Sequence, residues 1–162
     1  MVFNLEFSKK LIEAAESLKT NNGDLDDSGR AILYLSLLSC EISLKAFLEK
    51  ANVPIGNIKK ISHDLARLLK DIGEYEIEKE VIPGKKGWVR ATCLRSIVVD
   101  NNYRNATVGT LLTPDLANAS KYPNEIRYGD LVKHFNPIVM LNCARKVLEW
   151  VMDNYHSIKV KP

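Results

Sequence analysis

The sequence predicts an all-α protein, an antiparallel up-and-down bundle of four to five helices in one domain over residues 1–162. The chain has 162 residues with 46% hydrophobic and 27% charged content, which suffices for a single sizeable core. Apolar residues recur at spacings of three and four over several long segments. With 8 Gly, 6 Pro and no low-complexity run, the composition is not that of a fibrous or linker-rich protein.

The first predicted helix covers residues 5–19. Leu11, Ala15 and Leu18 fall at helical spacing with charged residues between them, the pattern of an amphipathic surface helix. Asn and Gly residues at 21–24 tolerate the left-handed conformation and end this helix.

The second predicted helix, residues 29–51, is apolar almost all round, so it belongs in the centre of a bundle or across a dimer interface. Asp27 or Ser28 can cap its start. Glu41 and Lys45 are the exception to its apolar character, four residues apart and therefore on one face. Their simplest interpretation is an ion pair within the helix; a role in ligand binding is the alternative.

A third helix is predicted to begin at the capping residue Ser62 and to carry an apolar stripe from Leu65 to Ile72. The charged segment 74–86 then reads as a solvated helix end, followed by a mobile basic loop around Lys85.

A fourth helix is predicted over residues 88–103, although the run 97–99 would equally suit a short strand. Helix is preferred because no second strand with period-two alternation is evident. A short helix follows at 113–120, then polar turns at 121–136, and the last amphipathic helix begins near Pro137 and reaches Tyr155.

Charge and cysteine content narrow the possible functions. The formal net charge of +3 permits nucleic-acid binding without arguing for it. The 3 Cys are widely separated, which offers neither a disulfide framework nor a paired metal site. No phosphate-binding glycine loop, zinc-helix motif or serine-hydrolase elbow occurs, so no cofactor or metal is expected. Without a signal peptide or a membrane-length apolar run, the expected location is the cytoplasm.

Three segments in order resemble a known family: Ser-Cys-Glu-Ile-Ser-Leu-Lys-Ala-Phe-Leu at 39–48, Ser-His-Asp-Leu at 62–65, and Lys-Tyr-Pro at 121–123 before the last helix. Together they resemble the HEPN domain (higher eukaryotes and prokaryotes nucleotide-binding) over residues 29–155. The resemblance implies an all-α bundle, usually a homodimer. It also implies either metal-independent RNA cleavage or binding of nucleotides or partner proteins without cleavage.

The ribonuclease branch of that family is marked by Arg followed after four to six residues by His, and the match here is Arg127 with His134. In that branch His moves a proton from the ribose 2′-hydroxyl and Arg stabilises charge on the phosphate. This sequence departs from the pattern because Gly129 lies inside the motif and Pro137 follows it closely, which predicts a loop where the family has a helix.

The sequence therefore favours a HEPN-like module that binds a nucleotide, RNA or a partner protein without cleaving it. The predicted ligand-binding residues are Glu41, Lys45, His63, Lys121, Tyr122 and Tyr128. The alternative is an endoribonuclease of a toxin–antitoxin or phage-defence system with Arg127 and His134 as catalytic residues. Expected partners are a second copy of the chain and a nucleotidyltransferase-like or antitoxin protein, with no membrane contact.

Overall fold

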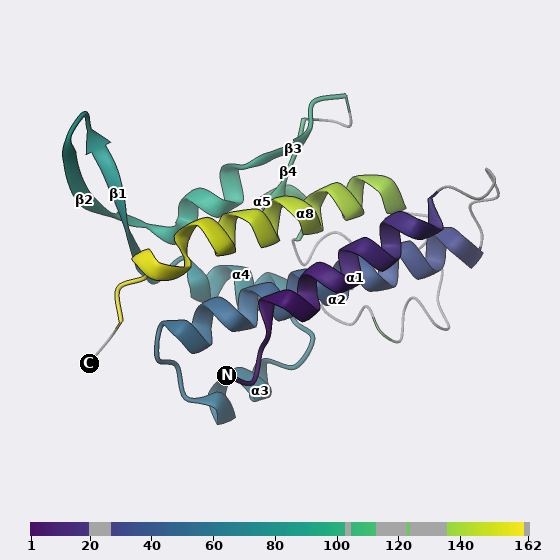
Figure 1. The fold of residues 1–162 in the computed structure, drawn as a ribbon, viewed down its shortest axis with the longest axis horizontal. Coiled ribbons are helices and arrows are strands. Elements are labelled where there is room, and N and C mark those ends of the chain that lie inside the picture. Colours follow the sequence, from purple (N-terminus) through teal and green to yellow (C-terminus); the bar gives the residue numbers. More distant parts are fainter. Residues whose placement is uncertain (20–26, 103–104, 113–122, 124–135, 161–162) are drawn as a thin grey trace.

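The computed structural model describes residues 1–19, 27–102, 105–112, 123 and 136–160. These residues are mostly helical, and three long helices lie side by side: α1 (Leu5–Leu18), α2 (Asp27–Lys50) and α8 (Pro137–Asn154) (Figure 1). The three long helices predicted from apolar spacing are confirmed within one or two residues at the ends that the structure describes.

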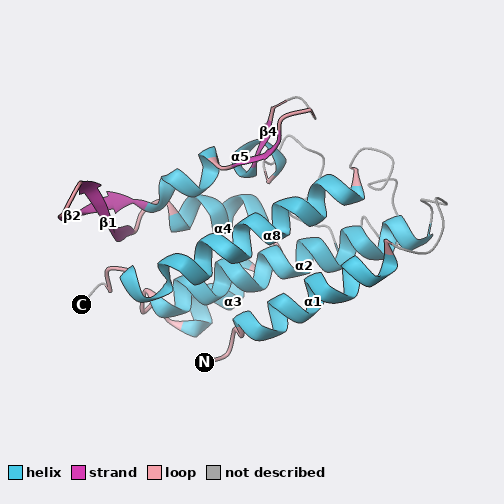
Figure 2. Cartoon of the chain, turned by 45° about the horizontal axis from the view of Figure 1, so that its top comes forward, coloured by secondary structure: helices cyan, strands magenta, loops and turns pink. Residues whose placement is uncertain are grey.

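Helix α2 forms the centre of the core. Its residues pack against α1 on one side, α8 on another and the shorter α4 (Leu65–Ile72) on a third (Figure 2). Leu33, Leu37, Leu44 and Phe47 are almost completely buried by these neighbours. The nearly continuous apolar circumference thus reflects a helix surrounded within its own chain.

Side-chain pairs set the directions of these helices. Cys40 of α2 contacts Cys143 of α8, and further along both helices the Phe47 ring stacks on the Trp150 ring with centroids 5.6 Å apart, so α2 and α8 run parallel. Ser8 of α1 hydrogen-bonds the hydroxyls of Ser39 and Ser43 at 2.7 and 2.8 Å, in a buried polar contact that fixes α1 on α2. Since the N-terminal Phe3 lies beside Lys45, α1 is antiparallel to α2.

The described residues are mostly helical but not all-α, because the segment 74–86, predicted as a helix end and a basic loop, lies largely in strands. They form an antiparallel hairpin of β1 (Glu76–Ile82) and β2 (Lys85–Arg90) that projects from one end of the helices (Figure 1). Gly84 turns the chain at φ 75°, a conformation that favours glycine. Ile77 is fully buried at the base of the hairpin and bridges to Ile158, which ties the hairpin to the core.

The predicted helix over 88–103 is also wrong. After β2 the chain makes a 3₁₀ helix, η1 (Ala91–Ser96), and then β3 (Val98–Asp100), which pairs with β4 (Ala106–Thr107). The partner strand has only two residues and therefore gives no alternating pattern that a sequence could reveal.

Two short helices follow α2, where only one was predicted. Residues 52–61 lie between the predicted second and third helices, and within them the chain forms α3 (Ile55–Ile61), after a break at Asn52 with φ 67°. The cap of α4 is Asp64, whose side chain accepts from the Arg67 amide at 2.8 Å, and not Ser62 as predicted. Another short helix, α5 (Val108–Leu111), and the 3₁₀ turn η3 (Tyr155–Ser157) complete the described elements.

The predicted turn at 21–24 and the predicted helix at 113–120 lie outside the described residues. All three cysteines are free, as expected, and Cys40 and Cys143 are buried between α2 and α8. Hydrogen bonding to Cys143 and burial together raise the pKa of the Cys40 thiol well above its usual value, so it stays protonated.

Helix α2 is long and apolar enough to span a membrane, but 72% of its most apolar stretch is buried inside the protein. That burial is typical of the core helix of a soluble globular protein.

The burial of α2 within its own chain also removes the argument that a second copy is required to cover this helix. The homodimer stays a prediction.

Candidate functional site

The predicted pair on α2 forms the buried part of the site. The Lys45 ammonium Nζ lies 2.6 Å from Glu41 Oε1, one helical turn away. Their side chains are only 8% and 6% exposed. The prediction that the two residues share a face is therefore confirmed, and the pair sits deeper in the protein than a surface ion pair.

The imidazole of His63 joins this pair from the turn between α3 and α4. His63 Nδ1 lies 2.9 Å from Glu41 Oε2, across 22 residues of sequence. A carboxylate can only accept, so Nδ1 carries the proton of this hydrogen bond. The His63 side chain is 49% exposed. Glu41 thus links a buried ammonium to an imidazole at the surface.

The backbone beside His63 is held in an uncommon conformation. Ser62 has φ 58° and ψ −125°, in the left-handed half of the map that L-residues rarely adopt. Such strain costs on the order of 1–3 kcal/mol and persists where the surrounding structure enforces it. Here the α3–α4 turn carries that strain and holds the His63 side chain against Glu41.

The N-terminal residues cover the buried side of the pair. The Phe3 ring lies 5.6 Å from Lys45 Nζ, a cation–π contact. Glu49 fixes this segment by accepting from the Val2 and Phe3 amides at 2.7 and 2.8 Å. Lys45 is therefore neutralised by a carboxylate and shielded by an aromatic ring, while solvent reaches the site mainly at His63.

The remaining predicted site residues are Lys121, Tyr122, Arg127, Tyr128 and His134, and they lie outside the described residues. The structure thus brings Glu41, Lys45 and His63 into one cluster, and their role in ligand binding stays a prediction. Among the described residues, no group of three His, Cys, Asp or Glu could hold a metal ion.

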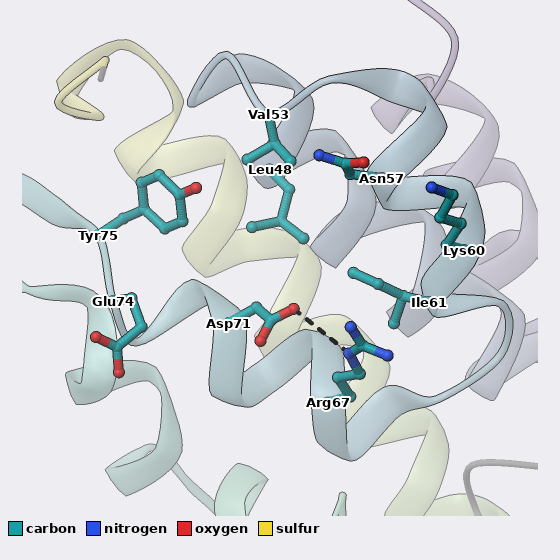
Figure 3. A pocket seen from close by; sticks show the side chains of 9 residues that line it. All are labelled: Leu48, Val53, Asn57, Lys60, Ile61, Arg67, Asp71, Glu74 and Tyr75. Atoms are coloured by element: carbon teal, nitrogen blue, oxygen red, sulfur yellow. Dashed lines mark ion pairs between the residues drawn. The ribbon is translucent and has the colours of Figure 1, made fainter. Parts of the chain in front are cut away.

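A pocket that the sequence did not suggest opens between α3, α4 and the end of α2 (Figure 3). It has a volume of about 350 Å³. Leu48 and Ile61 form its apolar floor, and charged residues of both signs surround it. The pocket was missed because no helix was predicted between residue 51 and Ser62, where α3 forms one wall.

Comparison with known proteins gave no relative. Scans against protein-family models and searches of curated proteins and of solved structures found no match to this chain.

Proposed function

We propose that this protein is a HEPN-like binding module that contacts a nucleotide or RNA at His63 and does not cleave it. The observation that carries the proposal is the buried Glu41 carboxylate, which binds the buried Lys45 and orients a half-exposed imidazole. Fixing one ring nitrogen of a histidine sets the orientation in which the ring meets a ligand.

Stability alone gives little reason for this arrangement. Removing two charges from water costs several kcal/mol per ion, and apolar residues of similar size often serve a core equally well. A buried ion pair that continues into a surface histidine next to a strained residue is the kind of feature that marks a functional site. We therefore assign the cluster to ligand binding.

The charges around the turn favour an anionic ligand. Lys59 and Lys60 lie in the last turn of α3, and Arg67 lies in the first turn of α4, beyond the capping Asp64, so exposed cations occur on both sides of His63 along the chain. Lys and Arg side chains donate hydrogen bonds to phosphate oxygens. The imidazolium form of His63, in which both ring nitrogens donate, can bind Glu41 and a phosphate oxygen together, which supports a phosphate-bearing ligand over an uncharged one.

Absence of cleavage is inferred from the sequence. Arg127 and His134 are separated by the longest spacing that the family motif allows, with Gly129 between them. Glycine disfavours a regular helix, and two catalytic groups without a rigid helix to carry them are poorly positioned for proton transfer.

The test is binding of a fluorescein-labelled single-stranded RNA, with ATP as competitor, by the full chain in EDTA. Anisotropy measures the Kd, and a denaturing gel shows whether the RNA stays intact. We expect His63→Ala to weaken binding about tenfold or more, as loss of a charge-assisted hydrogen bond would. The matched control is His156→Ala, because His156 is also exposed but lies in η3.

Two outcomes would overturn the proposal. Cleavage in EDTA that disappears in an Arg127→Ala, His134→Ala double variant would establish the ribonuclease alternative. Failure of both RNA and ATP to bind the folded protein, with circular dichroism as the folding control, would remove nucleotides and RNA as ligands and leave a partner protein.

A further inference from the structure

The pocket between α3 and α4 is a second candidate site, and it contains none of Glu41, Lys45 or His63. Its volume of about 350 Å³ is at the small end of the range for ligand pockets. Leu48 is 1% and Ile61 7% exposed, so the floor is built from core side chains and not from a mobile surface. A small molecule with an apolar part matches this floor.

The charges around the opening are balanced. Lys60 and Arg67 supply two positive charges, and Asp71 and Glu74 supply two negative charges. Figure 3 shows Lys60 on the α3 wall, across the opening from Asp71 on α4. Arg67 and Asp71 both lie on α4, so charges of both signs are mixed around the opening. A ligand with one charge would be attracted by some of these side chains and repelled by others, whereas a ligand that carries both charges can pair with side chains of both signs.

The cationic side chains at the pocket can still pair with a ligand. The Lys60 ammonium and the Asn57 side chain make no hydrogen bond or ion pair with another described residue. Arg67 Nε lies 3.9 Å from Asp71 Oδ2, with both side chains well exposed. An exposed pair at this distance contributes little, so either partner can turn to a ligand at small cost.

The acidic residues Asp71 and Glu74 are close to a rigid aromatic ring. The Tyr75 ring packs edge-on against Phe47 with centroids 6.3 Å apart, which fixes it at the margin of the pocket. Desolvation raises the pKa of the Tyr75 hydroxyl, and the nearby negative charge of Asp71 raises it further. Asp71 therefore lies close enough to the Tyr75 ring for one ligand to contact both side chains.

We propose that this pocket binds a free apolar α-amino acid. The ligand carboxylate pairs with Lys60 and Arg67, the α-ammonium pairs with Asp71, and the side chain packs on Leu48, Ile61 and the Tyr75 ring. This goes beyond the nucleotide or RNA site proposed above. The two sites share the cations Lys60 and Arg67, but His63 belongs to the first alone and Asp71 to the second alone, so variants of these two residues let either proposal fail alone.

The experiment is a titration of the isotope-labelled full chain with L-leucine, L-valine and L-phenylalanine, followed by two-dimensional NMR. We expect saturable shifts concentrated at the residues of α3, α4 and Tyr75 for at least one of the three. The paired comparison uses 4-methylpentanoate, which lacks the ammonium of leucine, and 3-methylbutylamine, which lacks its carboxylate. Each should bind at least about tenfold more weakly than leucine, because one ion pair is lost.

Variants locate the charges. Lys60→Ala and Asp71→Asn should each weaken binding of the amino acid about tenfold. Lys70→Ala is the matched control: Lys70 is an exposed lysine of α4 outside the pocket, and its loss should change the Kd less than twofold. His63→Ala should likewise leave amino-acid binding intact, whatever its effect on RNA.

Three results would overturn the proposal. They are absence of shifts with all three amino acids, binding of 4-methylpentanoate as tight as that of leucine, and unchanged affinity in folded Lys60→Ala and Asp71→Asn variants. The second result would make the pocket a carboxylate site.

Discussion

At the scale of single residues, the Glu41 carboxylate is held by two partners. One oxygen accepts from Lys45 and the other from His63, so a single carboxylate neutralises a buried ammonium and orients a surface imidazole. Its removal leaves the Lys45 ammonium buried without its counter-ion. The consequences differ for the two partners, because Lys45 is buried and His63 is half-exposed.

We therefore expect Glu41→Ala to lower the free energy of unfolding by about 3–5 kcal/mol, the usual cost of breaking a buried pair. The double variant Glu41→Leu, Lys45→Met should recover most of that loss, since both charges are then gone. Urea unfolding followed by circular dichroism measures the difference. Equal destabilisation in the single and double variants would contradict this account.

At the scale of elements, helix ends decide what apolar spacing leaves open. Helix α8 begins after Asn136, whose side chain accepts from the Ile138 amide at 2.9 Å and the Val139 amide at 3.3 Å. Pro137 then occupies the first helical turn, where its missing amide hydrogen costs nothing. This local chemistry allowed the start of α8 to be predicted within one residue.

The cap gives a direct prediction. Asn136→Ala should lower the free energy of unfolding by about 1 kcal/mol, because two amides at the start of α8 lose their acceptor. Asn136→Asp keeps an acceptor oxygen, so its free energy of unfolding should stay within roughly a few tenths of a kcal/mol of that of the original protein. Thermal or urea denaturation of the three proteins in parallel makes the comparison. A loss in Asp as large as in Ala would show that the amide nitrogen, and not the cap, matters.

The β1–β2 hairpin shows where element prediction failed. Charged residues dominate this segment, with Glu76, Glu78 and Glu80 at every second position of β1, so its charge resembles that of a solvated helix end. Only Ile77 is fully buried, and Val81 and Ile82 near the tip are exposed. Strands that bury so little have no apolar stripe to reveal them, and the informative signal was the turn at Gly84.

At the scale of the whole molecule, the hairpin and the helices are packed on one core. Phe47 of α2 contacts Trp150 of α8 on one side and Tyr75, just before β1, on the other. The Ala91 amide, just after β2, donates to the Tyr75 carbonyl at 2.9 Å. The structure therefore joins the hairpin to the helices through side chains and backbone.

We expect the chain to unfold in one cooperative transition. The helices are followed by circular dichroism, and the core by the fluorescence of Trp150 in a Trp88→Phe variant. The two urea curves should coincide. Phe47→Ala should lower the free energy of unfolding by about 3–5 kcal/mol, and the urea midpoints of both signals should fall together. Separate midpoints would contradict the single-domain prediction for residues 1–162.

The sequence by itself determined the three long helices and the polar pair within the central one. Apolar spacing places α1, α2 and α8 because helical periodicity is a local property of the chain. A separation of four residues puts Glu41 and Lys45 together for the same reason.

Only the tertiary structure decided the rest of the site. His63 meets Glu41 across 22 residues because α3 and the strained Ser62 direct the chain back over α2. The pocket exists because Lys60 on α3 and Asp71 on α4 are brought to opposite sides of Leu48. Such contacts depend on how helices pack, and no spacing within a single helix records them.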